Sequence, residues 1–138
     1  MKFYKSYSLA LSFLSASLVV HGKDWPTWGG NSSRNMVSVE SQIVMDFNPG
    51  EMDDDEKVDM STTKNIKWVA KLGSQAYGNV TISNGRVFVG TNNESPRDEG
   101  KKGDRGVVMC FDEKTGDLVW QLVIPKLGAG KVSDWEYI

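Results

Sequence analysis

The stretch Ser83-Asn84-Gly85-Arg86-Val87-Phe88-Val89-Gly90-Thr91 is typical of a β-hairpin, because a two-residue turn precedes a run of β-branched and aromatic residues. Asn84 and Gly85 readily adopt the positive φ angles of a primed turn, the strongest short-range signal for a hairpin. We therefore expect antiparallel strands over residues 79–83 and 86–91.

Further strands are predicted on both sides of this hairpin. Residues 106–111 and 117–124 are two more candidates, joined by the turn Asp112-Glu113-Lys114-Thr115-Gly116, in which Asp112 can hydrogen-bond its own turn and Gly116 can take the left-handed conformation. A fifth strand is predicted over residues 66–72. The last two apolar runs are nearly continuous, which predicts that both faces of the sheet are covered. No segment beyond residue 22 has helical periodicity, so the fold class is all-β.

A repeated tryptophan indicates how the strands are arranged. Ile66-Lys67-Trp68-Val69 and Leu118-Val119-Trp120-Gln121 each carry Trp at the third place, 52 residues apart. The connection 92–105 is much longer than the roughly 2 to 5 residues of a hairpin loop. Without that excess, the period is roughly 40 to 43 residues, the length of a four-stranded propeller blade. We expect Trp68 and Trp120 on outer strands, packed over neighbouring blades.

These segments resemble the repeat of the pyrroloquinoline-quinone-like (PQQ-like) β-propeller proteins, on residues 83–91, 106–112 and 115–120. The opening Asp24-Trp25-Pro26-Thr27-Trp28 is similar to the leader before the first blade in exported members. The resemblance implies a partial β-propeller: the first four-stranded antiparallel blade and the start of the next over residues 66–138. Structural roles are expected for Trp68, Trp120, Gly85 and Gly116, and a plug or closure contact for Trp25 and Trp28.

The family includes quinoprotein dehydrogenases and a non-catalytic propeller of the outer-membrane assembly machinery. We favour a binding or scaffold module, whose partners are the remaining propeller blades that one blade needs in order to bury its faces. The alternative is a PQQ-dependent alcohol or sugar oxidoreductase with its cofactor site outside residues 1–138. Resemblance to the dehydrogenases implies PQQ with calcium, a vicinal disulfide and an acidic base. Since Cys110 is the one cysteine and no acid matches a family motif position, no catalytic, cofactor or metal residue is assigned here.

The first 22 residues are typical of a secretory signal peptide. Lys2 and Lys5 precede a largely apolar run from Ser8 to Val20, and Gly22 stands before the expected cleavage site. Serines interrupt this run, and it is shorter than the roughly 20 residues that span a bilayer. We expect a periplasmic or secreted protein without stable membrane insertion, and the lack of a cysteine at the cleavage site disfavours a lipoprotein.

Composition excludes several classes of function. With 16 basic and 18 acidic residues, the net charge of −2 offers no broad basic field for nucleic acid. The single histidine, His21, lies in the signal peptide. The exported chain then lacks the imidazole of Ser-His-Asp or Cys-His systems and of histidine metal sites. Cys110, inside an apolar run, is predicted to be a small buried hydrophobe rather than a reactive thiol.

Residues 23–65 are predicted to form an irregular acidic leader. Seven carboxylates gather between Asp46 and Asp59, which raises the question of a calcium site. An EF-hand loop spaces its acids at alternate positions and has Gly at the sixth, but residues 53–56 are contiguous acids. We expect a solvated, self-repelling loop.

Candidate ligand-binding residues follow from the alternation of turns in an up-and-down blade. The long connections 72–78, 92–105 and 125–135 should emerge at one end of the sheet and the tight turns at the other. Elaborated loops tend to carry function, so a protein or small-molecule ligand is expected on the long-loop face. A solvated loop or a contact between blades is the alternative, because residues 92–105 balance four acids with four bases. The candidates are Tyr77, Arg97, Asp98, Lys101, Lys102, Asp104, Arg105, Lys131, Asp134 and Trp135.

Overall fold

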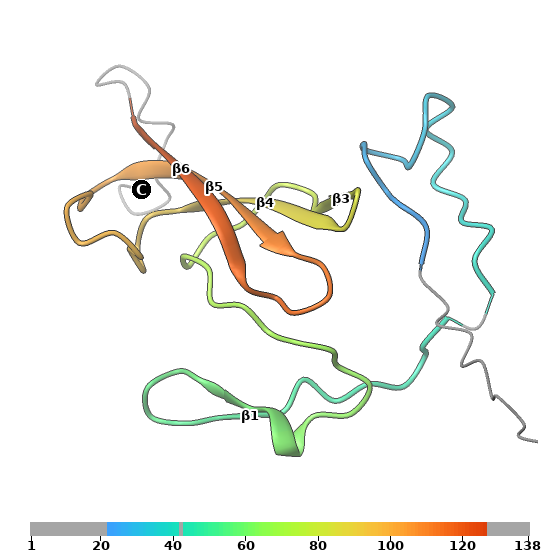
Figure 1. Cartoon of the computed structure of the whole chain (residues 1–138), viewed down its shortest axis with the longest axis horizontal. Helices are drawn as coiled ribbons and strands as arrows, with labels where there is room; N and C mark the ends of the chain where they lie inside the picture. Colours follow the sequence, from blue (N-terminus) through green and yellow to red (C-terminus); the bar gives the residue numbers. More distant parts are fainter. Residues whose placement is uncertain (1–21, 42, 127–138) are drawn as a thin grey trace, which may run out of the picture.

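The structure is a computed structural model that describes residues 22–41 and 43–126 (Figure 1). These residues are essentially all-β, with a four-stranded antiparallel sheet in the order β3-β4-β5-β6 and a two-stranded sheet β1-β2. The strands of the larger sheet are β3 (Thr81–Ser83), β4 (Arg86–Asn92), β5 (Arg105–Asp112) and β6 (Leu118–Pro125). Each strand pairs with its neighbour in sequence, so the sheet is a meander, and the four strands predicted beyond residue 78 are confirmed.

The hairpin between β3 and β4 has the predicted turn. Asn84 and Gly85 have φ angles of 51° and 70°, and Ser83 pairs directly with Arg86 across the turn. These positive φ angles let the two strands follow the right-handed twist of the sheet without splaying apart. The local residues therefore determine the register at this end of the sheet.

One face of the sheet carries the hydrophobic core, and we call it the inner face. Its buried residues come from alternate positions of the two central strands: Val87, Val89, Val107, Met109 and Phe111. Trp68, Ala70 and Leu72 pack against this core from residues 66–72, which we call the covering segment. Figure 1 shows the chain of the covering segment, in light green, leading from the short 3-10 helix η1 (Met60–Thr62) toward the sheet.

The covering segment corrects two expectations. Residues 66–72 form no strand, and Trp68 covers the inner face instead of lying on an outer strand beside another blade. The edge of β3 is already engaged, because Trp25 and Ile82 exchange backbone hydrogen bonds of 2.9 and 3.0 Å. Trp25 thus bridges the free side of β3, whereas Trp28 is exposed. The alternating pattern of residues 66–72 therefore arises because one side of an extended chain packs on the core. The segment does not pair with a strand of the sheet.

The opposite side of the sheet, the outer face, has no such cover in the described residues. Cross-strand pairing places the following residues on it: Phe88, Val108, Cys110, Trp120, Leu122 and Ile124. Trp120 is 45%, Leu122 52% and Ile124 50% exposed. Within the described part of the chain, residues 66–72 cover only the inner face, so the cover expected from neighbouring blades on the outer face stays a prediction.

Cys110 is nevertheless buried, at 1% exposure, and it is a free cysteine, as predicted. It lies in register between Phe88 and Trp120, and their ring centroids are 6.1 Å apart. These two large side chains flank the small one across three neighbouring strands. A thiol enclosed in this way behaves as a hydrophobe.

The acidic leader contains more order than the sequence indicates. A hairpin forms from β1 (Glu51–Met52) and β2 (Val58–Asp59), and Asp53 closes its turn by accepting hydrogen bonds from the backbone N–H groups of Asp55 and Lys57. The run of acids thus contributes a turn as well as a solvated surface. The predicted signal peptide, residues 1–22, lies outside the described residues except for Gly22. No helix in the described part of the chain has the length and hydropathy needed to cross a membrane.

Candidate functional site

A shallow depression of about 250 Å³ lies where the long connections meet the ends of β4 and β5. Three glycines, Gly78, Gly90 and Gly106, contribute to its lining. The remaining lining residues are Gln75, Tyr77, Thr91, Asn92, Arg105 and Lys126. It therefore combines residues from three connections that the sequence predicts at one end of the sheet.

The floor of the depression exists because two strand positions have no side chain. Gly90 on β4 and Gly106 on β5 are on the outer face, where Gly90 pairs with Val108 and Asn92 with Gly106. A Cβ atom built on either glycine would meet no atom within 4 Å. Glycine inside a strand weakens it and often marks a place where a ligand or another backbone approaches closely. The open space above these residues fits that role.

The wall of the depression is held against the edge of β4. Thr91 Oγ1 donates to the backbone oxygen of Gln75 at 3.0 Å and accepts from the N–H of Gly73 at 3.0 Å. The N–H of Asn92 also donates to Gln75 O, at 3.1 Å. Gly73 must be glycine here, because a Cβ atom would lie 2.0 Å from the Asn92 side chain. The chain leading to Tyr77 is therefore fixed at its base, while Tyr77 itself is 86% exposed.

The charges at the depression are basic. Arg105 and Lys126 are the charged residues of its lining, and no acidic residue takes part. Lys126 Nζ lies 2.6 Å from Asp104 Oδ1, which offsets part of this charge. Arg105 Nε donates to Lys102 O at 2.9 Å. Its terminal nitrogens make no hydrogen bond or ion pair to the described residues. An anionic group would find a donor here.

Of the ten predicted candidates, the structure places Tyr77 and Arg105 on the depression and Asp104 beside it through Lys126. Asp98 and Lys101 instead form an ion pair within their own loop, at 3.4 Å, and Lys102 contributes its backbone oxygen to Arg105. Lys131, Asp134 and Trp135 lie outside the described residues.

Arg97 was expected on the long-loop face, but it contacts the covering segment and the core. Its Nη2 donates to the backbone oxygen of Lys71 at 2.8 Å, and its guanidinium carbon lies 5.7 Å from the centroid of the Phe111 ring. The long loop therefore folds back onto the covering segment and the core. A cation over an aromatic face is a stabilising contact, so Arg97 joins the packing of the inner face.

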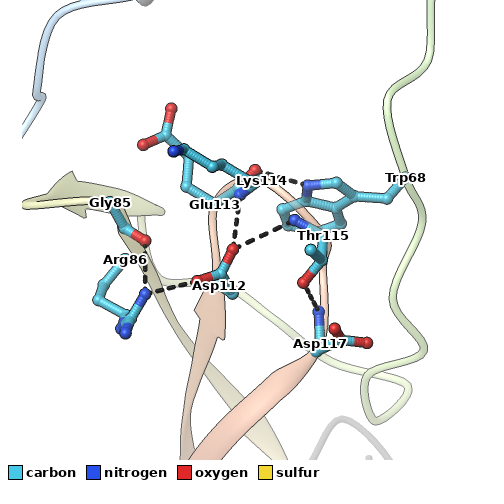
Figure 2. A network of polar contacts seen from close by, with 8 residues as sticks. All are labelled: Trp68, Gly85, Arg86, Asp112, Glu113, Lys114, Thr115 and Asp117. Atoms are coloured by element: carbon cyan, nitrogen blue, oxygen red, sulfur yellow. Dashed lines mark hydrogen bonds and ion pairs between the residues drawn. The ribbon is translucent and has the colours of Figure 1, made fainter.

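The tight turn at the opposite end is a closed network of polar contacts (Figure 2). Asp112 Oδ1 accepts from the N–H groups of Lys114 and Thr115 at 2.9 and 3.2 Å, and Oδ2 pairs with Arg86 at 2.6 Å. The hydrogen bond from Lys114 N–H is the largest cause of a lowered pKa of Asp112, with Thr115 N–H and Arg86 adding to it against desolvation. Both oxygens of this carboxylate are engaged, Oδ1 by the turn and Oδ2 by Arg86 on β4, which indicates a structural role.

Trp68 reaches that network from the covering segment and packs against Gly116 in the turn. Trp68 Nε1 donates to the backbone oxygen of Glu113 at 2.8 Å (Figure 2). The ring centroid of Trp68 lies 6.2 Å from that of Phe111. Gly116 has a φ of 77°, and a Cβ atom there would come 2.6 Å from the indole. The two residues therefore have linked structural roles, because the Trp68 indole occupies the space that a side chain at position 116 would need.

PQQ with calcium is the cofactor that the family resemblance implies, with its site expected outside residues 1–138. Calcium takes roughly six to eight oxygen ligands that converge on one point. Among residues 22–41 and 43–126, no group of three or more His, Cys, Asp or Glu side chains is arranged to hold a metal ion.

Seven residues of the depression are not among the sequence candidates: Gln75, Gly78, Gly90, Thr91, Asn92, Gly106 and Lys126. Gly90 carried a usable signal, because it interrupts the apolar strand pattern that begins at Val87. Gln75 and Lys126 stand in connections whose paths the sequence leaves open. Comparison of the chain with protein-family models, curated proteins and solved structures finds no match.

Proposed function

We propose that the chain is an exported binding scaffold of the PQQ-like β-propeller kind, in which the four-stranded sheet is the first blade. The order β3-β4-β5-β6 and its two tight turns support this proposal, because a propeller blade is a four-stranded antiparallel meander. The residues that resemble the family repeat, 83–91, 106–112 and 115–120, account for most of these strands and one of the turns.

The observation that carries the proposal is the difference between the two faces of the sheet. The inner face is closed by the covering segment, while the outer face leaves Val108, Trp120, Leu122 and Ile124 exposed. Soluble monomers rarely expose contiguous apolar patches larger than a few hundred Å². A blade stacked on its neighbour buries such a face, since repeat units obtain their core from one another.

The occupant that fits this face is another four-stranded sheet of the same kind. The described exposed residues of the outer face on β5 and β6 are apolar and carry no charge, so a charged partner would lose hydration there without gaining an ion pair. Sheets pack face to face about 10 Å apart with interdigitated side chains. When no neighbouring blade is present, a second copy of the chain can take its place.

Sedimentation of the full chain tests this proposal. We expect the native chain to self-associate and Leu122→Asp to sediment as a folded monomer, because a carboxylate on the outer face cannot be buried against an apolar sheet. Val69→Asp is the matched control, since Val69 is a similarly exposed apolar residue on the covering segment. A native chain that is monomeric at all concentrations, or association lost equally in both variants, would contradict the proposal.

A further inference from the structure

We propose that Glu40 binds the new N-terminus that removal of the signal peptide creates at Lys23. Lys23 is the first residue after the predicted signal peptide, and its backbone N–H donates to Glu40 Oε1 at 3.0 Å. Cleavage between Gly22 and Lys23 places a charged amine at this nitrogen, beside the carboxylate. The inference rests on the export that the proposed function includes, but it does not depend on the stacking of sheets.

The peptide bond to be cut is accessible in the folded chain. Gly22 and Lys23 are both exposed, and a Cβ atom built on Gly22 would meet no atom within 4 Å. A small residue before the cut is typical of signal-peptide cleavage sites. The cut is a hydrolysis, in which water adds across the bond, Gly22 receives the carboxylate and the nitrogen of Lys23 becomes an amine. An α-amine is mostly protonated at neutral pH.

The surroundings of Glu40 suit it to receive this amine. Glu40 is half-buried, and its own N–H donates to Ser38 Oγ at 3.1 Å, which fixes the backbone that carries the carboxylate. Within the described residues, the carboxylate has no hydrogen-bond or ion-pair partner besides the Lys23 nitrogen. An amide offers it one donor and no charge, whereas an ammonium group offers three donors and a positive charge. Cleavage therefore converts a hydrogen bond into a charge-assisted ion pair.

The two residues that follow Lys23 are held against the edge of β3. Asp24 Oδ2 accepts from the N–H of Asn84 at 2.9 Å, and Trp25 exchanges backbone hydrogen bonds with Ile82. An uncovered edge strand is open to pairing with another chain. An N-terminus fixed by Glu40 therefore keeps the start of the leader over this edge.

The position of the cut decides whether the ion pair forms. Residues 23–40 form a loop whose two ends meet at the contact between Lys23 and Glu40 (Figure 1). A cut before Gly22 leaves the nitrogen of Lys23 in a neutral amide and moves the charged amine away from Glu40. A cut after Lys23 removes the donor. The cut between Gly22 and Lys23 is thus the one that closes the loop with two charges.

Mass spectrometry and amine labelling of the exported protein test the inference. The full chain is expressed with its signal in a secreting host, and we expect a product that begins at Lys23. Glu40→Gln keeps an acceptor but removes the charge, so the α-amine should react with an acylating reagent about two- to fivefold faster at neutral pH, as loss of an exposed ion pair predicts. Glu51→Gln removes an equal charge from an exposed residue of β1 that makes no contact with Lys23, and the rate should not change.

Hydrogen exchange at Ile82 provides the second measurement. Its N–H donates to Trp25 O at 3.0 Å, so its exchange rate reports whether the leader stays on β3. Exchange should be faster in Glu40→Gln than in the native chain or Glu51→Gln. An exported product that begins at another residue, or an α-amine equally reactive with Glu and Gln at position 40, would overturn the inference and leave export intact. A product that retains Met1 would overturn both this inference and the proposed export.

Discussion

Gly85 and Gly116 both have positive φ angles, yet only Gly116 faces another side chain. Open space surrounds the Cβ position of Gly85, whereas the Trp68 indole lies 2.6 Å from that of Gly116. Gly85→Ala should cost about 1–2 kcal/mol for its left-handed backbone alone. Gly116→Ala should lose a further 1–3 kcal/mol or so, because the indole must shift within a packed core.

Urea unfolding of the two alanine variants measures this difference. The slope of the transition should stay constant, since neither substitution changes the surface exposed on unfolding. If Gly85→Ala lowered the free energy of unfolding as much as Gly116→Ala, the contact between Gly116 and the Trp68 indole would not contribute to stability.

The ionisation of Asp112 should make the free energy of unfolding depend on pH in the acid range. Its lowered pKa in the folded chain means that its contribution is complete above the ordinary value of 3.8 and is lost as the pH falls through the lowered pKa. Asp112→Asn keeps an acceptor for the turn but removes the charge, so its melting temperature should fall less steeply in acid. Part of the slope should remain, because the pKa values of Glu56 and Asp59 are also lowered, by Lys71 and Ser61 respectively.

Thermal melts of the native chain and Asp112→Asn between neutral pH and the acid range provide this comparison. A shared acid slope for both proteins would mean that the Asp112 charge is equally stabilised in the unfolded chain. Asp112→Ala should be less stable than Asp112→Asn at every pH, since it also removes the acceptor for Lys114 and Thr115.

At the scale of elements, the covering segment is the part that joins the two ends of the fold. Trp68 packs on Phe111 and also donates to Glu113 O in the tight turn. Trp68→Phe keeps an aromatic ring but loses the hydrogen bond, so it should destabilise the chain by about 1–2 kcal/mol in urea unfolding. Trp28→Phe is the control, since Trp28 is 60% exposed, and it should have little effect. Equal effects of the two substitutions would count against the packing role of the covering segment.

The two tight turns could be predicted from the sequence, because residues adjacent in the chain determine them. Asn84-Gly85 sets a primed turn, and Asp112 with Gly116 closes the next one. The state of residues 66–72 could not be predicted in this way. Their alternating pattern suits a strand, but the free side of β3 is taken by Trp25, which lies far away in sequence.

The candidate site was predictable only in part, for a similar reason. The alternation of turns places Tyr77 and Arg105 at one end of the sheet, and both line the depression. Arg97 is drawn away by contacts with Lys71 and Phe111 that depend on how the long loop folds back. Lys126 reaches the depression because β6 ends beside β5, a consequence of register rather than of local sequence.

At the scale of the whole molecule, the two faces of the sheet differ in what covers them. The chain supplies its own cover for the inner face from residues 66–72, and the outer face presents apolar side chains of β5 and β6. From this asymmetry we propose that the outer face is buried against a second sheet.

Reaction of a single introduced thiol with maleimide tests that claim most directly. Cys110, the one natural cysteine, is buried and gives little background. In Leu122→Cys, the new thiol lies on the outer face, and in Val69→Cys it lies on the covering segment. We predict that the thiol at 122 reacts rapidly in dilute protein and becomes protected as the chain associates, while the thiol at 69 reacts at the same rate throughout. A thiol at 122 that stays equally reactive at every concentration would contradict the account.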